Sequence, residues 1–346
     1  MLHRRDEYVK ALIAELRDRQ AYLPERRINS IYLGGGTPSL LQADSISMIL
    51  QEIQRLFQVQ DEAEITLEAN PCDLTTNYLQ QIATIGINRL SIGIQSFNNR
   101  LLTLIGRRHN ATEALRAVVL AKQAGFSNIS IDLIYGLPTQ TAAEWKSELQ
   151  QALDLNIQHI STYCLSYEEG TFMKQMLQNG EIEAIDDDTE NEMYALLVNT
   201  LTDNGFVQYE VSNFAKFGFY SRHNSAYWNS TPYLGLGASA HSFDGKSRQW
   251  NISDLDGYIQ AANTHTLQPE KEILTEQDKY NEQIMLSLRT AKGLSLGTLN
   301  NDDRKYCLSK AEPFVRNGQL LLKQDRLTAS LKGINILNII TEHLMK

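Results

Sequence analysis

The sequence predicts an α/β fold, a partial (β/α) TIM-like barrel of five strands followed by a smaller helical, winged-helix-like domain. Up to residue 170, short apolar segments alternate with amphipathic segments about every 30 residues, the rhythm of a parallel sheet. Glycine and polar residues gather directly after the apolar segments, where barrels of this kind place their sites. Beyond residue 170 the rhythm stops and long helical patterns take over.

The predicted strands are short and apolar, which indicates burial on both faces. They cover residues 30–33, 64–71, 89–95, 129–134 and 160–165. The helices between and before them show apolar residues at helical spacing. They cover residues 7–16, 43–57, 76–85, 111–124 and 143–153. Because the strands number fewer than the eight of a complete barrel, the sheet is expected to stay open.

After residue 170 the pattern predicts a long helix over residues 186–202. Its first turn holds Asp186, Asp187 and Asp188, and carboxylates are favourable at the positive end of a helix. We therefore interpret this acidic run as a helix start rather than a metal site. The expected organisation has three parts. These are a barrel at 1–212, an aromatic and glycine-rich connection at 213–274 and a C-terminal domain at 275–346.

Composition narrows the class of function. The chain has 346 residues, 42% of them hydrophobic, and a formal net charge of −9. That acidity argues against nucleic acid as the main partner, because phosphate neutralisation needs a basic surface. No apolar run approaches the roughly 20 residues of a membrane span, and no secretory leader is recognisable. We expect a cytoplasmic protein without an integral membrane segment.

A glycine-rich loop, residues 34–38 (GGGTP), follows the first predicted strand and precedes a helix. Glycines allow close approach of the backbone, and the free N–H groups of such a loop bind an anion or an amino-acid carboxylate. The loop lacks the Gly-Lys-Ser/Thr ending of a P-loop and is not a Rossmann fingerprint. A tight turn without a ligand is an equally good interpretation.

Three polar residues, Glu68, Gln95 and Asp132, stand at or near the ends of successive predicted strands. Arg107 lies at the start of the helical region that follows the strand at 89–95. In a barrel such side chains converge on one mouth. Together they could bind the amino group, carboxylate and ribose hydroxyls of an adenosyl amino acid. The alternative for each residue alone is a structural hydrogen bond at the barrel rim.

A second constellation is the HNxxYW segment formed by His223, Asn224, Tyr227 and Trp228. A histidine beside aromatic side chains can ligate heme iron while the aromatic rings stack on the porphyrin. The alternative is a structural loop with a hydrogen-bonded histidine. Cysteines add little, because Cys72, Cys164 and Cys307 lie far apart without CxxC spacing and are interpreted as ordinary thiols.

In this order, the segments resemble the radical-SAM core of oxygen-independent coproporphyrinogen oxidases and their relatives. They are residues 34–39 (GGGTPS), 68–71 (EANP), 91–97 (SIGIQSF), 106–109 (GRRH) and 132–138 (DLIYGLP). The resemblance runs from about residue 6 to the C-terminus. The HNxxYW segment is similar to the mark of the heme-chaperone branch of that family, which is the reason for preferring this branch over the oxidases.

The resemblance implies two sets of ligand contacts. S-adenosylmethionine would be contacted by Gly35, Gly36, Thr37, Glu68, Gln95, Arg107 and Asp132. Heme would be contacted by His223, with Asn224, Tyr227 and Trp228 around it. The implied function is a heme-binding chaperone that passes heme to an acceptor protein.

The family also carries a CxxxCxxC motif, whose three thiolates hold a [4Fe–4S] cluster. In this sequence none of the three cysteines has that spacing, and the motif and the first strand would precede residue 6. A truncated chain or wrong start at Met1 is favoured over a degenerate member of the family, because losing a strand leaves a sheet edge unpaired.

Two further functions remain open on the sequence. Radical decarboxylation of coproporphyrinogen III needs the cluster, so enzymatic activity of this polypeptide alone is uncertain. A non-catalytic protein that binds S-adenosylmethionine or a tetrapyrrole is the other alternative.

Overall fold

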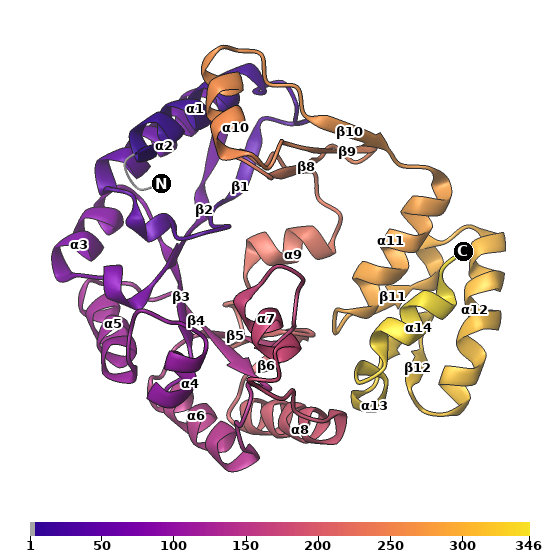
Figure 1. Cartoon of the computed structure of the whole chain (residues 1–346). Coiled ribbons are helices and arrows are strands. Elements are labelled where there is room, and N and C mark those ends of the chain that lie inside the picture. The colour runs from indigo at the N-terminus through magenta and orange to yellow at the C-terminus, as the bar shows by residue number, and fades with distance from the viewer. Residues whose placement is uncertain (1–3) are drawn as a thin grey trace.

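A computed structural model describes residues 4–346. Its centre is a curled seven-stranded sheet in the order β1-β2-β3-β4-β5-β7-β6, in which β1 to β5 run parallel and β7 pairs antiparallel with β5 and β6 (Figure 1). The strands are β1 (Arg27–Leu33), β2 (Gln58–Ala69), β3 (Arg89–Gln95), β4 (Ile129–Tyr135), β5 (His159–Cys164), β6 (Val207–Glu210) and β7 (Asn213–Ala215). The predicted partial barrel is confirmed.

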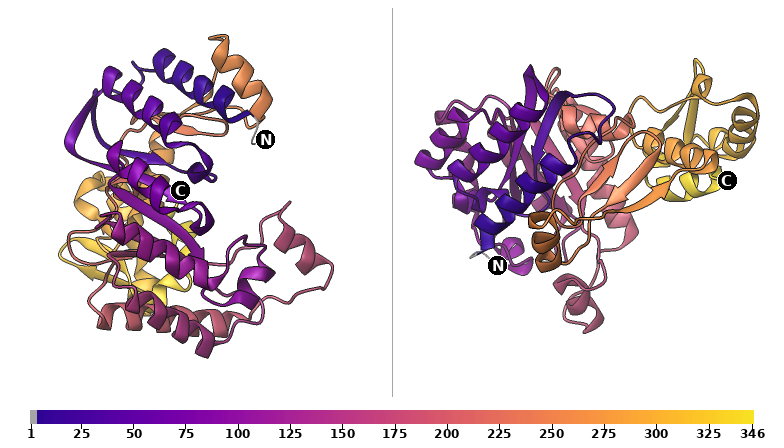
Figure 2. Two further views of the ribbon diagram at one scale, coloured as in Figure 1. Left: turned by 90° about the vertical axis from the view of Figure 1, so that its left-hand side faces the viewer. Right: turned by 90° about the horizontal axis from the view of Figure 1, so that it is seen from above.

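Most helices cover the convex side of the sheet, while α9 (Arg222–Trp228) lies within the curl against β1 and α7 (Phe172–Gln178) projects away from the sheet (Figures 1 and 2). The helices before α9 are α1 (Arg5–Asp18), α2 (Ala43–Leu56), α3 (Thr76–Thr84), α4 (Asn99–Leu104), α5 (Ala111–Gln123), α6 (Ala142–Asp154), α7 (Phe172–Gln178) and α8 (Asp187–Asp203). The arrangement leaves the concave side open for polar groups and α9.

Local chemistry explains why these elements begin where they do. Helices α5 and α6 start with capping boxes, in which the side chains of Asn110 and Thr141 accept hydrogen bonds from the third helical residue. Asp186 caps α8 by accepting a hydrogen bond from the Thr189 backbone. The acidic run at residues 186–188 is therefore a helix start, as predicted. Strand β3 is buried along nearly its whole length, consistent with a strand covered on both faces.

The chain continues with a small antiparallel sheet and a separate C-terminal lobe, which lies beside the barrel (Figure 2). The small sheet comprises β8 (His241–Phe243), β9 (Ser247–Trp250) and β10 (Glu270–Ile273), with α10 (Leu255–Asn263) packed on α1. The lobe contains α11 (Glu276–Leu288), β11 (Leu294–Ser295), α12 (Asn301–Arg316), β12 (Leu320–Lys323), β13 (Arg326–Ala329), α13 (Leu331–Ile334) and α14 (Leu337–Leu344). It has its own apolar cluster, in agreement with the predicted smaller domain. In residues 4–346 no helix has the length and apolarity to cross a membrane.

A buried carboxylate joins the first helix to the connecting region. Glu15 of α1 is fully buried and accepts hydrogen bonds from the Gly237 backbone, Tyr258 Oη and Asn251 Nδ2 at 2.9, 2.7 and 2.7 Å. It also pairs with Arg19 at 2.8 Å. Because all four donors converge on one buried charge, removing it deprives the Gly237 N–H and the Tyr258 hydroxyl of their acceptor and the Arg19 guanidinium of its nearby anion.

We expect Glu15→Ala to lower the free energy of unfolding by about 3–5 kcal/mol, the usual effect of breaking a buried pair. Chemical denaturation at neutral pH measures it. The control is Glu312→Ala, which removes an exposed pair with Arg316 and should change stability little. Equal losses in both variants would contradict the role assigned to Glu15.

Candidate functional site

A cavity of about 1320 Å³ follows β1 along its whole length. On one side β1 pairs with β2, and among residues 4–346 no strand pairs with its other edge. The cavity runs along that edge. Its wall includes the glycine-rich loop, part of α9 and the segment 231–236. The GGGTP loop and the HNxxYW segment, far apart in sequence, thus meet at one cavity.

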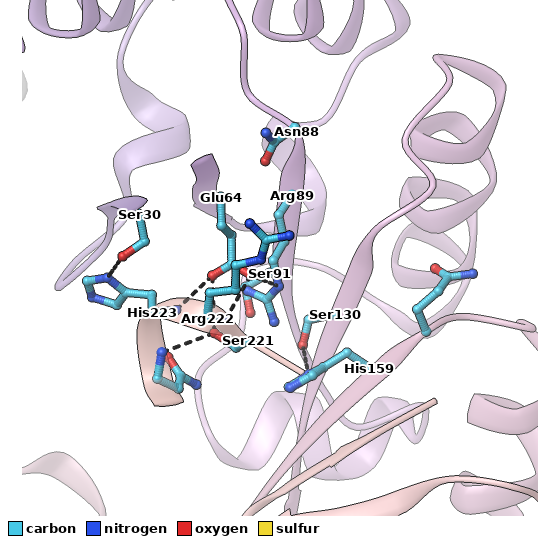
Figure 3. Close-up of polar contacts among 12 residues, drawn as sticks. Ser30, Glu64, Asn88, Arg89, Ser91, Ser130, His159, Ser221, Arg222 and His223 are labelled. Atoms are coloured by element: carbon cyan, nitrogen blue, oxygen red, sulfur yellow. Dashed lines mark hydrogen bonds and ion pairs between the residues drawn. The ribbon is translucent and has the colours of Figure 1, made fainter. Parts of the chain in front are cut away.

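His223 is held at this cavity by three neighbours. Its ring stacks on the ring of Tyr32, with centroids 4.6 Å apart and planes inclined by 15°. Tyr227 meets it edge-on at 4.9 Å, and Nδ1 shares a hydrogen bond of 3.2 Å with Ser30 Oγ (Figure 3). Within the described residues Nε2 makes no hydrogen bond, and it is absent from the buried polar atoms without a partner. This nitrogen can therefore be reached from the cavity.

The environment keeps His223 neutral. Burial lowers the pKa of its imidazole to about 4, and the positive Arg89 acts in the same direction against the opposing Glu64 carboxylate. A neutral imidazole is the form that coordinates a metal ion or heme iron. At neutral pH the side chain of His223 is therefore uncharged.

The backbone before His223 is bound by Glu64, a buried residue of β2 (Figure 3). Its carboxylate accepts hydrogen bonds from the backbone N–H groups of Arg222 and His223, both at 3.0 Å. Ser221 Oγ donates a third at 3.4 Å, and the guanidinium of Arg89 lies 3.9 Å away. One charge on the sheet thus meets the whole first turn of α9.

The other residues of the predicted heme set differ in position. Asn224 and Tyr227 contribute to the cavity wall, whereas Trp228, the last residue of α9, does not. Burial raises the pKa of the Tyr227 hydroxyl to about 12, so it stays protonated. Tyr227 also packs edge-on against Tyr233 at 4.6 Å. Within this set, His223, Asn224 and Tyr227 are brought together at the cavity.

The glycine-rich loop is tied to Glu68, the second group predicted from sequence. Glu68 accepts hydrogen bonds from Tyr32 Oη at 2.7 Å and from the Gly35 backbone at 3.1 Å. A Cβ at Gly34 would lie 2.3 Å from the Tyr32 ring and 2.7 Å from the Glu68 carboxyl, so any other residue there would have to displace these two side chains. Gly36 and Thr37 follow in the same exposed loop on the cavity wall.

Gln95 and Arg107, two further residues predicted to contact S-adenosylmethionine, lie together at the end of β3, on the rim of the barrel. A Cβ on Gly93 would lie 2.8 Å from Gln95 Nε2 and 3.2 Å from Arg107 Nη2, which shows that both groups lie over this glycine. Gln95 has a φ of +68°, a left-handed conformation that is unusual outside glycine. Arg107 donates to the Gly93 carbonyl at 3.0 Å, and its Nε is buried without a partner. Buried donors without a partner are rare in native structures.

Asp132 lies in the middle of β4, opposite Ser161, rather than near the strand end as expected. It accepts a hydrogen bond from Ser91 Oγ at 3.1 Å. Burial raises the pKa of its carboxyl to about 6, and the neighbouring Glu68 carboxylate adds to this shift.

Glu68, Gln95, Arg107 and Asp132 do not line the large cavity. Tyr32 connects the two groups, because its ring carries His223 while its hydroxyl binds Glu68.

No set of three or more histidine, cysteine or carboxylate side chains in the described part of the chain could hold a metal ion. Cys72 is exposed, Cys164 half-buried and Cys307 buried in the C-terminal lobe. Burial raises the pKa of the Cys164 thiol to about 12 and that of Cys307 to about 11, so neither is a thiolate at neutral pH. These residues do not fit a [4Fe–4S] cluster.

Sequence reasoning missed Ser30, Tyr32 and Glu64, which hold His223. A usable signal exists, because Ser30 and Tyr32 alternate with apolar residues on β1, as do Glu64 and Glu68 with their neighbours on β2. Such alternation places polar groups on one face of a strand. The polar residues on β1 and β2 differ from the expectation that both faces of every strand are apolar, and they indicate that the concave side of the sheet is polar.

Comparisons with known proteins agree with one another. A family model described as the Radical SAM superfamily matches residues 3–152. The heme chaperone HemW of Lactococcus lactis subsp. lactis (strain IL1403) is 36% identical over 296 residues, which cover 86% of this chain and 77% of the relative. The heme chaperone HemW of Bacillus subtilis (strain 168) is 35% identical over 293 residues, covering 84% and 77%.

Among solved structures, the coproporphyrinogen III oxidase HemN from Escherichia coli, described as a radical SAM enzyme, is similar with a TM-score of 0.85. The match covers 100% of this chain and 84% of that chain at 23% sequence identity. At this identity the likeness concerns the fold. It extends over the barrel, the connecting region and the C-terminal lobe alike.

We expect the imidazole of His223 to titrate near pH 4, against 6.5 for an ordinary histidine. The denatured chain then takes up the proton first, so this residue lowers stability as pH falls from about 6.5 towards 4. Side-chain NMR of the histidines over this range measures the pKa, with the urea-denatured chain as control. Titration of His223 near pH 6.5 in the folded protein would contradict its burial.

Proposed function

The chain belongs to the HemW/HemN-like family of radical SAM proteins, and on this premise we propose that it binds heme through His223 and transfers it to an acceptor protein. The observation that carries the proposal is the neutral, stacked imidazole at the cavity, with Nε2 free of internal hydrogen bonds. Relatives at 35–36% identity bear the name heme chaperone HemW. We place this activity in the cytoplasm.

Physical features of the cavity support a tetrapyrrole as ligand. A volume of about 1320 Å³ exceeds the roughly 300–1,000 Å³ of sites for drug-sized molecules. Tyr32 and Tyr227 supply aromatic surface beside the ligating nitrogen, and Leu234 and Leu236 add apolar surface to the wall. Asn224 on the same wall offers a polar group to the ligand edge. Trp228 would act indirectly, by supporting the end of α9.

We further propose that S-adenosylmethionine binds on the rim around Glu68. Gly35, Gly36 and Thr37 would accept it with their backbone, and Arg107, with its unpartnered Nε, would meet the carboxylate of the methionyl part. Gln95 and Asp132 would bind the remaining polar groups. When bound beside an iron–sulfur cluster, this cofactor supplies radical chemistry. Because the thiols of residues 4–346 do not fit that cluster, the function proposed for the rim is binding of the cofactor alone.

Hemin titration of the purified protein is the test of heme binding. We expect a Soret band that saturates, and its loss or displacement in His223→Ala because the axial ligand is gone. The control is His241→Ala, since His241 also lines the cavity but stacks on Trp250 instead of Tyr32. Loss of binding in the control with retention in His223→Ala would assign the ligand to His241. Incubation with an apo-hemoprotein then measures transfer.

Calorimetry measures binding of S-adenosylmethionine. Arg107→Ala removes a charged donor, so we expect affinity to fall by about tenfold or more. The matched control is Arg108→Ala, whose guanidinium is exposed and lies 3.5 Å from Asp73. Unchanged affinity in Arg107→Ala would remove this residue from the proposed contacts.

A further inference from the structure

We propose that Glu64 is a positioning residue for the heme ligand: it binds the first turn of α9 and thereby holds His223 with Nε2 facing the cavity. The inference rests on the proposed heme-binding function. Glu64 does not belong to the cavity wall, so it would act through His223 rather than by touching the ligand. No sequence motif pointed to it.

The carboxylate meets three successive residues of the chain. Oε1 accepts from the His223 N–H at 3.0 Å and from Ser221 Oγ at 3.4 Å, while Oε2 accepts from the Arg222 N–H at 3.0 Å. Three contacts on consecutive residues define both the position and the direction of this turn. Because the carboxylate is buried, water does not offer these donors an equivalent partner.

Charge balance keeps Glu64 in place. The guanidinium of Arg89 lies 3.9 Å from its Oε2, and the two side chains are 2% and 5% exposed. A buried carboxylate without a cation and hydrogen-bond donors is strongly unfavourable. In this arrangement Glu64 has Arg89 as its nearby cation and the start of α9 as its source of hydrogen-bond donors.

Helix α9 needs such an anchor because it is short. With seven residues it is far below the length at which a helix is stable by itself. Ser221 adds a local cap by accepting a hydrogen bond from the Asn224 N–H at 3.2 Å. Contacts with β1 and the tie to Glu64 attach the helix to the barrel.

Strand β1 binds the side chain of His223 and strand β2 binds its backbone. Ser30 of β1 and Glu64 of β2 are direct partners in the sheet register. Ser30 bonds to the imidazole Nδ1 at 3.2 Å, while Glu64 binds the backbone N–H of His223. In the tautomer that donates from Nδ1 to Ser30, the lone pair of Nε2 is available to iron. Register thus sets the orientation of the ligating atom.

The first experiment uses the heme-free protein, so it tests whether Glu64 holds the start of α9 independently of heme binding. Glu64→Gln keeps the shape but replaces one accepting oxygen with an NH₂ group that opposes a backbone N–H. We expect faster hydrogen exchange in the peptide covering residues 221–228, with the rest of the barrel unchanged. Unchanged exchange in this peptide would overturn the proposal.

The second experiment titrates hemin into the same variant. We expect affinity to fall by about tenfold and the Soret band to broaden, because His223 samples several orientations. The matched control is Glu148→Gln, which alters an equally buried carboxylate on α6 bonded to Ser96. It should bind hemin as the wild type does. Wild-type affinity and spectrum in a folded Glu64→Gln would also overturn the proposal.

A milder variant covers the case in which Glu64→Gln does not fold. Ser221→Ala removes one contact to Glu64 and the local cap, and we expect about fivefold weaker hemin binding with faster exchange of residues 221–228. Wild-type hemin affinity together with wild-type hydrogen-exchange protection of residues 221–228 would contradict the role assigned to Glu64. If wild-type protein binds no hemin, the heme function fails, while the exchange result still decides whether Glu64 holds α9.

Discussion

The concave side of the sheet is organised by a buried ion pair, Glu64 on β2 with Arg89 on β3. Removing two charges from water is costly unless each is surrounded by partners. The Arg89 guanidinium lies 3.9 Å from the Glu64 carboxylate. The hydrogen bonds to that carboxylate come from Ser221 Oγ and from the N–H groups of Arg222 and His223. A helix that would otherwise be too short to persist is thereby held inside the curl, and His223 with it.

This constraint explains how the two candidate ligand regions meet. Once α9 is anchored, the ring of His223 rests on Tyr32, whose hydroxyl binds Glu68 beside the glycine-rich loop. The contacts form a continuous series from the α9 backbone to the Gly35 amide. Both regions therefore share side chains of β1 and β2.

Much of the fold could be predicted from local sequence. The strand at 89–95 and the helix starting at Ala111 lie where periodicity and capping place them, because these signals depend on neighbouring residues. Less was predictable in the connecting region. The strands β8 and β9 are only three and four residues long, too short for a pattern to distinguish them from loops. Strand β8 pairs with β9 across a short turn, and β9 pairs in addition with β10, which follows after α10.

The sequence by itself determined the βα order, the family and the residue types of both candidate sites, since all of these reside in short motifs and their order. Only the tertiary structure decided that Ser30, Tyr32 and Glu64 surround His223, because the contacts join residues more than 150 positions apart. It also placed Asp132 at mid-strand and Trp228 away from the cavity. Such positions follow from the curl and register of the sheet, which arise from the packing of the whole barrel.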